Sequence, residues 1–237
     1  MHHVDPASLD DLQKRVEYLR KFIDFTEDDA AALHAAKDVV APLVPAIVDA
    51  VYVKLLSFDI TAKSFVPRQT GYTGEAPTKL EDLNPEHPQI KFRKDFLGRY
   101  LVKLVTMDYS KPETWEYLDK VGLMHTGAAG FKHRISKPAL RVEYIHCGIL
   151  MGYVEDILVN TVITHPTLDI PTKNAVARAA NKLLWIQNDL FARHYIKDES
   201  EVFTQSTDTV TVKKSTAAAT ALACLVLGAV YTKVFRS

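Results

Sequence analysis

The chain has 237 residues, of which 47% are hydrophobic and 24% are charged, and this is an ordinary composition for a globular protein. Its 29 Lys and Arg residues balance its 29 Asp and Glu residues, so there is no overall basic field that would recruit nucleic acid. The two cysteines, Cys147 and Cys224, form no CxxC pair, which argues against a disulfide framework and fits a reducing compartment. Because no apolar run follows a basic start, no secretory signal peptide is expected.

Helical periodicity begins near the amino terminus. Apolar residues at helical spacing predict a helix over Leu9–Phe22, with Ser8 as its N-cap. Thr26 is followed by three acidic residues and then by an alanine-rich run. A threonine N-cap and acidic residues in the first turn both suit the positive end of the helix dipole. We therefore predict a second helix from Thr26 to about Ala41.

Prolines interrupt the pattern after this second helix. Pro42 and Pro45 break or bend it, and a further helix is predicted over Pro45–Ser57. Residues 66–88 contain four prolines and two glycines, which predicts a loop of unusual length for a compact domain. Helical periodicity resumes over residues 92–104.

A short helix is predicted next, over residues 112–125. Ser110 is its expected N-cap, and Pro112 lies in its first turn, where proline is well tolerated. Gly127 and Gly130 follow it, as is typical after a helix carboxyl end.

Two long helices follow, over about Pro138–Thr164 and Pro171–Lys197. Strand signals are weak along the whole chain, so the predicted fold class is all-α. Residues 199–214 are rich in Ser, Thr and Asp and are interpreted as a linker. The predicted organisation is thus a single helical domain over residues 1–198, the linker, and a carboxyl-terminal segment.

The carboxyl-terminal segment is apolar. Residues 215–232 form a stretch of 18 residues without a charge, with lysine or arginine on both sides. As a helix it would be roughly 27 Å long, which suits a thin bilayer. We interpret it as a transmembrane tail anchor because no polar face is visible. The alternative is a mildly apolar helix packed on the domain.

The residues that could carry chemistry are histidines. The sequence has no HExxH, Walker or GxGxxG motif, and its carboxylates are scattered, so hydrolysis has little support. No two histidines within one predicted helix share a spacing of three or four residues, so a non-haem metal cluster is not indicated. A haem requires only one neutral imidazole and apolar walls. His125, at the end of an amphipathic helix, suits that role, with an ordinary core or surface histidine as the alternative.

A family resemblance rests on this histidine. The stretch WEYLDKVGLMH, from Trp115 to His125, resembles the proximal helix of protoglobins and of the related globin-coupled sensor domains. In that family an aromatic residue and a short helix precede Ile/Val-Gly-Leu-x-His. Four other motifs occur in the family's order: Thr26-Glu27-Asp28 at the first core helix, Phe96-Leu97-Gly98-Arg99-Tyr100 on the distal-side helix, Arg141-Val142-Glu143-Tyr144 at the start of the next long helix, and Leu184-Trp185 in the last helix. The resemblance covers about residues 8–197 and implies a globin-like fold with an extra amino-terminal helix.

The resemblance also implies a cofactor and its site. The cofactor is haem b, with His125 as the proximal iron ligand. Tyr52 matches the distal tyrosine, whose hydroxyl faces the gas ligand, although by itself it reads as an ordinary half-buried tyrosine. Phe96, Leu97 and Tyr100 are expected to line the distal wall.

Three further positions concern the haem site: one expected contact and two departures from the family pattern. Tyr144 is expected to contact the haem, with simple helix packing as the alternative. Val51 stands where the family often has tryptophan, and Leu97 stands at the position of the distal phenylalanine. These two differences concern ligand preference and gas access rather than haem binding.

The implied function is reversible binding of oxygen, carbon monoxide or nitric oxide, as a sensor or carrier tethered to a membrane. One alternative is a haem enzyme with nitric-oxide dioxygenase or peroxidase-like turnover, which would need a reductant. Another is a helical interaction protein without haem. Expected partners are the gas, a membrane through the tail, and a second copy through the last two long helices, with no nucleic acid. The domain is expected in the cytosol, at the mitochondrial outer or peroxisomal membrane.

Overall fold

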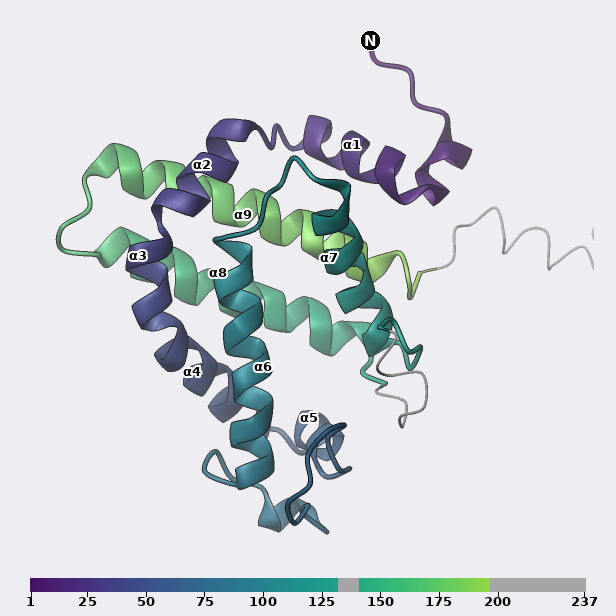
Figure 1. Cartoon of the computed structure of the whole chain (residues 1–237), viewed down its shortest axis with the longest axis vertical. Helices are drawn as coiled ribbons and strands as arrows, with labels where there is room; N and C mark the ends of the chain where they lie inside the picture. Colours follow the sequence, from purple (N-terminus) through teal and green to yellow (C-terminus); the bar gives the residue numbers. More distant parts are fainter. Residues whose placement is uncertain (132–140, 197–237) are drawn as a thin grey trace, which may run out of the picture. The chain divides into compact units, whose positions relative to one another are not determined.

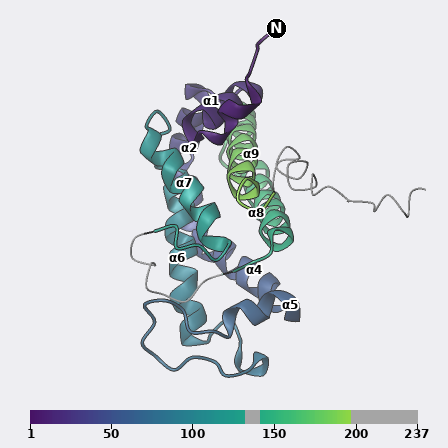
Figure 2. The same ribbon diagram turned by 90° about the vertical axis from the view of Figure 1, so that its right-hand side faces the viewer.

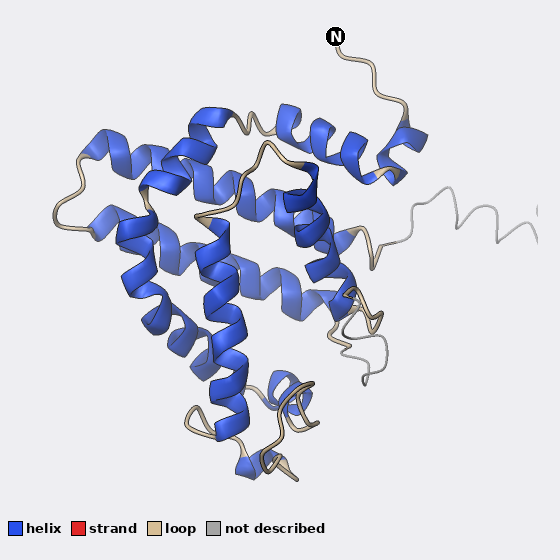
Figure 3. Ribbon diagram, in the orientation of Figure 1, coloured by secondary structure: helices blue, strands red, loops and turns tan. Residues whose placement is uncertain are grey.

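The computed structural model describes residues 1–131 and 141–196, where the regular secondary structure is helical apart from one isolated β-bridge between Thr126 and Arg141 (Figure 3). The α-helices are α1 (Leu12–Phe22), α2 (Glu27–Ala35), α3 (Lys37–Val40), α4 (Val44–Leu56), α5 (Asp59–Ala62), α6 (Pro88–Leu104), α7 (Pro112–His125), α8 (Tyr144–Thr164) and α9 (Ile170–Ala192). Short 3-10 helices are η1 (Pro6–Asp10), η2 (Ala41–Leu43), η3 (Lys63–Phe65) and η4 (Leu80–Asp82). The predicted all-α class is confirmed, whereas the predicted linker and apolar tail lie outside the described residues.

The first long helix begins later than the apolar spacing suggests. Its N-cap is Asp11, whose carboxylate accepts a hydrogen bond from the backbone nitrogen of Lys14 at 3.0 Å. The hydroxyl of Ser8 instead donates to the carbonyl of Asp5 at 2.6 Å, within η1. The prediction of Ser8 as the N-cap was therefore wrong, because an aspartate three residues further on takes that role.

The start of α2 is as predicted. Thr26 is the N-cap, and its backbone nitrogen donates to Oδ2 of Asp29 at 2.8 Å. The same carboxylate forms an ion pair of 2.9 Å with Lys182 on α9. Burial raises the pKa of Asp29, but the hydrogen bonds from Lys182 and Thr26 outweigh burial, so the pKa is lowered. The cap thus also attaches α2 to α9.

Pro42 and Pro45 interrupt the helical pattern at the predicted positions. Pro42 lies in η2, and α4 begins at Val44 with Pro45 in its first turn. The two helices α4 and α6 pack against each other, and a Cβ atom on Gly98 would lie 3.5 Å from the side chain of Val44, an ordinary van der Waals distance. Five residues of α4 are buried: Val44, Ile47, Val48, Val51 and Tyr52.

The connection between α6 and α7 differs from the prediction at its cap. Both the backbone nitrogen and the hydroxyl of Ser110 donate to Oδ1 of Asp108, at 3.0 and 2.6 Å. The N-cap of α7 is therefore Lys111, and the assignment of Ser110 was wrong because its hydroxyl is engaged with Asp108 in the preceding turn. The predicted bounds of α7 itself, residues 112–125, are confirmed.

The two long helices α8 and α9 run antiparallel and side by side, and they lie opposite α6 and α7 (Figures 1 and 2). α8 begins at Tyr144 rather than near Pro138, because Glu143 has an extended backbone and serves as its N-cap. α9 contributes the largest share of the core, with buried Val176, Ala179, Ala180, Leu183, Leu184, Ile186, Gln187, Leu190 and Phe191. Arg15 of α1 pairs with Asp189 of α9 at 2.6 Å, which attaches the extra amino-terminal helix to this core.

Two described segments are long and apolar enough to cross a membrane, by length and composition alone. They are Lys37–Leu56 and Tyr144–Thr164. Core helices of globular folds have the same composition. Both segments pack against other helices of this domain, α4 against α6 and α8 against α9, so they are weak support for a membrane span.

Candidate functional site

His125 is the last residue of α7, and its imidazole orientation is set by its own helix. The distance from Nδ1 to the carbonyl oxygen of Val121 is 2.7 Å. Because a carbonyl oxygen only accepts hydrogen bonds, Nδ1 must donate, and the proton of a neutral ring is therefore on Nδ1. The lone pair is then on Nε2. This is the tautomer that a histidine needs to coordinate a metal through Nε2.

His125 also makes contacts with two other parts of the chain, one through its ring and one through its backbone. Its ring packs against Phe191 of α9, with the ring centroids 5.1 Å apart. Its carbonyl oxygen accepts a hydrogen bond of 2.8 Å from the backbone nitrogen of Val142, just before α8. Gly127, with a φ of 100°, lets the chain turn immediately after the helix. His125 thus lies where α7, α9 and the approach to α8 meet.

Tyr52 lies on α4, with only 6% of its surface exposed. Its ring packs against Phe65, at a centroid distance of 5.6 Å. Burial raises the pKa of Tyr52 to about 12, while the nearby charge of Arg93 acts in the opposite direction. Within residues 1–131 and 141–196, its hydroxyl forms no hydrogen bond. Tyr52 is therefore a protonated donor at neutral pH.

Arg93 of α6 is a charged neighbour of Tyr52 that the sequence pattern did not single out. It is 9% exposed, and its guanidinium lies over the Phe65 ring, 5.0 Å from the ring centroid. Its Nη2 donates to the carbonyl of Pro67 at 3.2 Å. Phe65 is therefore in contact with both Tyr52 and a buried cation.

Gln89 fixes the chain around Phe65. This side chain is fully buried, and its Nε2 donates to the carbonyls of Phe65 and Pro67 at 2.9 and 3.1 Å. Its Oε1 accepts from the backbone nitrogen of Gln69 at 2.9 Å. The beginning of the long loop is thereby attached to α6 beside Tyr52.

The three predicted distal-wall residues on α6 have different environments. Phe96 is 46% exposed and packs edge-on against Phe92, with centroids 5.1 Å apart. Leu97 is partly buried against the apolar core that includes Tyr52. Tyr100 lies against the same core, and burial raises its pKa strongly. Leu97 and Tyr100 therefore share a core with Tyr52, whereas Phe96 lies at the surface of the described residues.

Tyr100 belongs to a hydrogen-bonded bridge that was not predicted. Its hydroxyl donates to Oε1 of Gln187 at 3.0 Å, and Nε2 of Gln187 donates to the carbonyl of Leu118 at 3.1 Å. Gln187 is only 1% exposed. One side chain of α9 therefore links α6 to α7. The available signal was a glutamine at an inward position of an apolar helix, between Leu183 and Leu190.

Tyr144 has the environment of a packing residue. Its hydroxyl donates to Oδ1 of Asn188 on α9 at 3.0 Å, and its ring lies 5.6 Å from that of Tyr195. These contacts hold the first turn of α8 against the end of α9.

Comparisons with known proteins agree with the all-helical fold. The Protoglobin family profile matches residues 12–201. The fold is similar to that of the globin domain of the Geobacter sulfurreducens globin-coupled sensor, with a TM-score of 0.57 and 18% sequence identity, and the match covers 76% of this chain and 97% of that chain. No curated protein sequence matches the chain. Because the family profile covers most of the sequence and the helices have the globin arrangement, the chain belongs to the protoglobin family, whose members are haem-binding and gas-binding globins.

Proposed function

We propose that this domain holds haem b through Nε2 of His125 and reversibly binds a diatomic gas: oxygen, carbon monoxide or nitric oxide. The observation that carries the proposal is the contact of 2.7 Å between Nδ1 of His125 and the carbonyl of Val121. It holds the ring as the neutral tautomer whose remaining nitrogen is an iron ligand. A hydrogen bond of this kind also raises the basicity of the ligand nitrogen.

The residues present fit a haem. Phe191 packs against the imidazole, and Leu97 and Tyr100 contribute apolar and aromatic surface from α6. Haem iron, when bound, supplies the coordination position that a gas ligand occupies. The role of the protein is to orient His125, to exclude water with these side chains and to provide a donor.

Tyr52 is the proposed donor. Its raised pKa keeps the hydroxyl protonated throughout the physiological range, and none of the described residues competes for its hydrogen. A neutral donor in an apolar pocket favours a polarised diatomic ligand over an unpolarised one, because the hydrogen bond is strong where water is excluded. We therefore assign Tyr52 to the distal side, and propose Phe96 and Tyr144 as outer contacts.

Haem titration tests this proposal. Purified full-length protein is mixed with haem, and the absorbance of the Soret band is followed for wild type, His125→Ala and His165→Ala. We expect a saturable Soret band for wild type and for the His165→Ala control, whose histidine follows α8 at its far end. His125→Ala should show weak, shifted absorbance. A wild-type protein that stays colourless would refute haem binding.

We also propose that residues 215–232 tether the domain to an intracellular membrane, mitochondrial outer or peroxisomal, so that it senses or carries the gas there. The support is the uncharged stretch of 18 residues with basic residues on both sides. The test is a fluorescent reporter fused to residues 205–237. A membrane-restricted signal supports the anchor, and a diffuse signal in the cytosol contradicts it.

A homodimer through α8 and α9 is the third part of the proposal. Ile145 and Ile149 are 70% and 71% exposed on α8, and Trp185 is 55% exposed on α9. Large exposed apolar side chains that recur on neighbouring helices are typical of helix-mediated association. Light scattering should give a dimer mass for wild type and a monomer mass for Ile149→Asp, with Ile60→Asp on α5 as the matched control. A wild-type monomer would contradict this part.

A further inference from the structure

Arg93 is a buried cation on the helix that carries the proposed distal wall. Among the buried residues of ranges 1–131 and 141–196, it is the one lysine or arginine. Leu97 follows it by four residues on α6, so the two side chains share one face of that helix. Burying a charge costs free energy of folding, because the charge loses its hydration. A cation at this position therefore calls for a role beyond packing.

Attachment of the long loop does not require this charge. The carbonyl of Pro67 accepts a hydrogen bond from Nη2 of Arg93 at 3.2 Å and another from Nε2 of Gln89 at 3.1 Å. Gln89 also binds the carbonyl of Phe65 and the backbone nitrogen of Gln69. A neutral side chain thus already holds the segment that Arg93 contacts.

Arg93 and Tyr52 lie against the same aromatic ring. The guanidinium of Arg93 lies 5.0 Å from the centroid of Phe65, and the ring centroid of Tyr52 lies 5.6 Å from it. The two side chains also interact electrostatically, since the charge of Arg93 opposes the rise that burial causes in the pKa of Tyr52. The resulting pKa of about 12 leaves the tyrosine hydroxyl protonated at neutral pH. One positive charge and one neutral hydroxyl donor are therefore neighbours in the interior.

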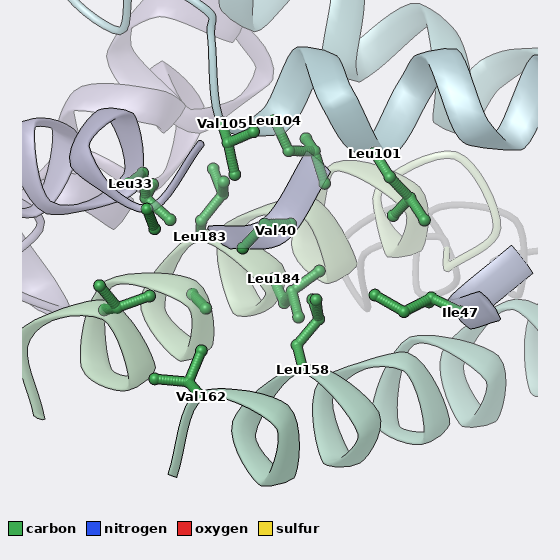
Figure 4. A pocket seen from close by; sticks show the side chains of 13 residues that line it. Leu33, Val40, Ile47, Leu101, Leu104, Val105, Leu158, Val162, Leu183 and Leu184 are labelled. Carbon is green, nitrogen blue, oxygen red and sulfur yellow. The ribbon is translucent and has the colours of Figure 1, made fainter. Parts of the chain in front are cut away.

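The apolar cavity in the same core has different chemistry. Figure 4 shows side chains that point into it, among them Ile47, Leu101 and Leu184, and every residue that lines it is aliphatic. Leu101 lies about two turns after Arg93 on α6. The two parts of α6 therefore differ, because the Leu101 part suits apolar groups and the Arg93 part suits a ligand with negative charge.

A cation and a hydroxyl donor in an interior of low dielectric attract an anion more strongly than a neutral molecule. We propose that Arg93, together with Tyr52, makes the distal side a binding site for a small monovalent anion such as nitrite, in addition to the neutral gas. Nitrite is small, and its oxygens accept hydrogen bonds from both kinds of donor. The inference rests on the proposed function for the haem, whereas the attraction between Arg93 and an anion does not depend on it.

Nitrite titration of the ferric, haem-loaded full-length protein tests the role of Arg93. The Soret band is followed at constant ionic strength for wild type, Arg93→Gln and Arg99→Gln. Arg99 is the matched control, since it lies on the same helix but is exposed and pairs with Asp95 at 2.8 Å. Loss of a charged donor should raise the nitrite Kd of Arg93→Gln by roughly tenfold, while Arg99→Gln stays at the wild-type value. The affinity of the ferrous Arg93→Gln variant for neutral carbon monoxide should change far less. Equal nitrite Kd values for wild type and a folded Arg93→Gln would overturn the proposal.

A second variant covers the possibility that Arg93→Gln does not fold. Tyr52→Phe keeps the ring that packs against Phe65 and removes only the hydroxyl donor. Its nitrite Kd should rise several-fold, by roughly the worth of one neutral hydrogen bond, about 1 kcal/mol. An unchanged nitrite Kd in Tyr52→Phe would likewise overturn the shared site.

A haem carboxylate is a second source of negative charge that Arg93 could bind. Transfer of haem from wild type and from Arg93→Gln to a scavenger protein separates the two sources. Faster haem loss from Arg93→Gln together with an unchanged nitrite Kd would assign Arg93 to the haem carboxylate and reject the anion site. Similar rates of haem loss together with the weakened nitrite binding support the proposal.

Side-chain NMR measures the attraction without haem. In ¹⁵N-labelled, full-length protein free of haem, the Nε–H resonance of Arg93 is identified by its absence in Arg93→Gln. Added nitrite should move this resonance saturably at constant ionic strength, and should move that of Arg99 much less. An Arg93 resonance that does not move would overturn the claim that Arg93 itself attracts the anion. Absence of haem binding together with the saturable shift rejects the proposed function and leaves the anion site standing.

Discussion

Gly122 of α7 lies so close to Leu190 of α9 that a Cβ atom on Gly122 would be 2.5 Å from the Leu190 carbonyl oxygen. The same Cβ atom would lie 3.0 Å from Cα of Phe191. Since these are backbone atoms, they cannot yield as a flexible side chain would. The two helices are therefore in backbone contact three residues before His125, at the point where Phe191 meets the imidazole.

Substitution of Gly122 by alanine should push α7 away from α9. The expected cost is on the order of 1–3 kcal/mol in the free energy of unfolding, the usual range for overpacking in a core. Haem affinity should fall as well, because the displaced helix carries His125. Urea denaturation and haem titration measure the two effects.

Gly98→Ala is the matched control for this prediction. Its Cβ would meet only the Val44 side chain, at an ordinary contact distance of 3.5 Å. Alanine in place of a helical glycine then stabilises by roughly 0.5–1 kcal/mol or is neutral. If the alanine variants of Gly122 and Gly98 show equal stability, the close crossing does not constrain α7.

The two ends of α7 could be predicted from the sequence, but its close contact with α9 could not. Pro112 and Gly127 act through local backbone geometry, so the helix bounds follow from the residues themselves. Position 122 requires a glycine because a side chain there would collide with the backbone of α9, which is nearly seventy residues away in the sequence. No local pattern contains that information.

The bridge through Gln187 makes a second prediction. Gln187→Leu leaves the Tyr100 hydroxyl without its acceptor in the core, which costs about 1–3 kcal/mol, whereas the Leu118 carbonyl keeps its hydrogen bond within α7. Tyr100→Phe removes only the donor and should cost less. In the double variant the two effects should be non-additive, because they remove one shared hydrogen bond. Additive unfolding free energies would show that the bridge is not formed in solution.

The hydroxyl of Tyr52 should slow the release of oxygen. Tyr52→Phe removes the proposed donor while keeping the ring that packs against Phe65. A lost hydrogen bond of about 1.4 kcal/mol corresponds to a tenfold faster off-rate, which stopped-flow spectroscopy with a competing ligand would detect. Tyr153→Phe, on α8, serves as the control. An off-rate identical to that of wild type removes Tyr52 from the distal role.

Alkaline pH gives an independent measure of the environment of Tyr52. Burial raises its pKa to about 12, against 10.0 for an ordinary tyrosine. Below pH 10 the tyrosine is protonated in both the folded and the unfolded protein, so its contribution to the free energy of unfolding is fully present. Between pH 10 and 12 only the unfolded protein ionises, so this contribution is lost as the pH rises. The loss attributable to Tyr52 is about 2–3 kcal/mol. Ultraviolet difference titration of wild type against Tyr52→Phe should locate this ionisation near pH 12, and a midpoint near 10 would contradict the burial.

Competition between short polar side chains explains where the caps were mispredicted. Ser8 and Ser110 are residues that often serve as N-caps, but each hydroxyl donates to a nearby aspartate instead. The hydroxyl of Ser8 donates to the backbone carbonyl of Asp5, and that of Ser110 donates to the carboxylate of Asp108. Thr26 was predicted correctly because Asp29 completes a reciprocal cap with it. The hydroxyl of Tyr144, for which the sequence offers no particular partner, donates to Asn188 on α9. Sequence shows which groups can bond, whereas the fold decides which pairs do.

The most direct test of the central claim is chemical rescue at position 125. In His125→Gly the proposed ligand is deleted, and free imidazole can enter the space that its ring occupied. The ferrous carbon monoxide spectrum of haem-loaded His125→Gly should be altered without imidazole and return to the wild-type Soret position when imidazole is added. A wild-type spectrum for His125→Gly in the absence of imidazole would contradict the assignment of His125 as the iron ligand.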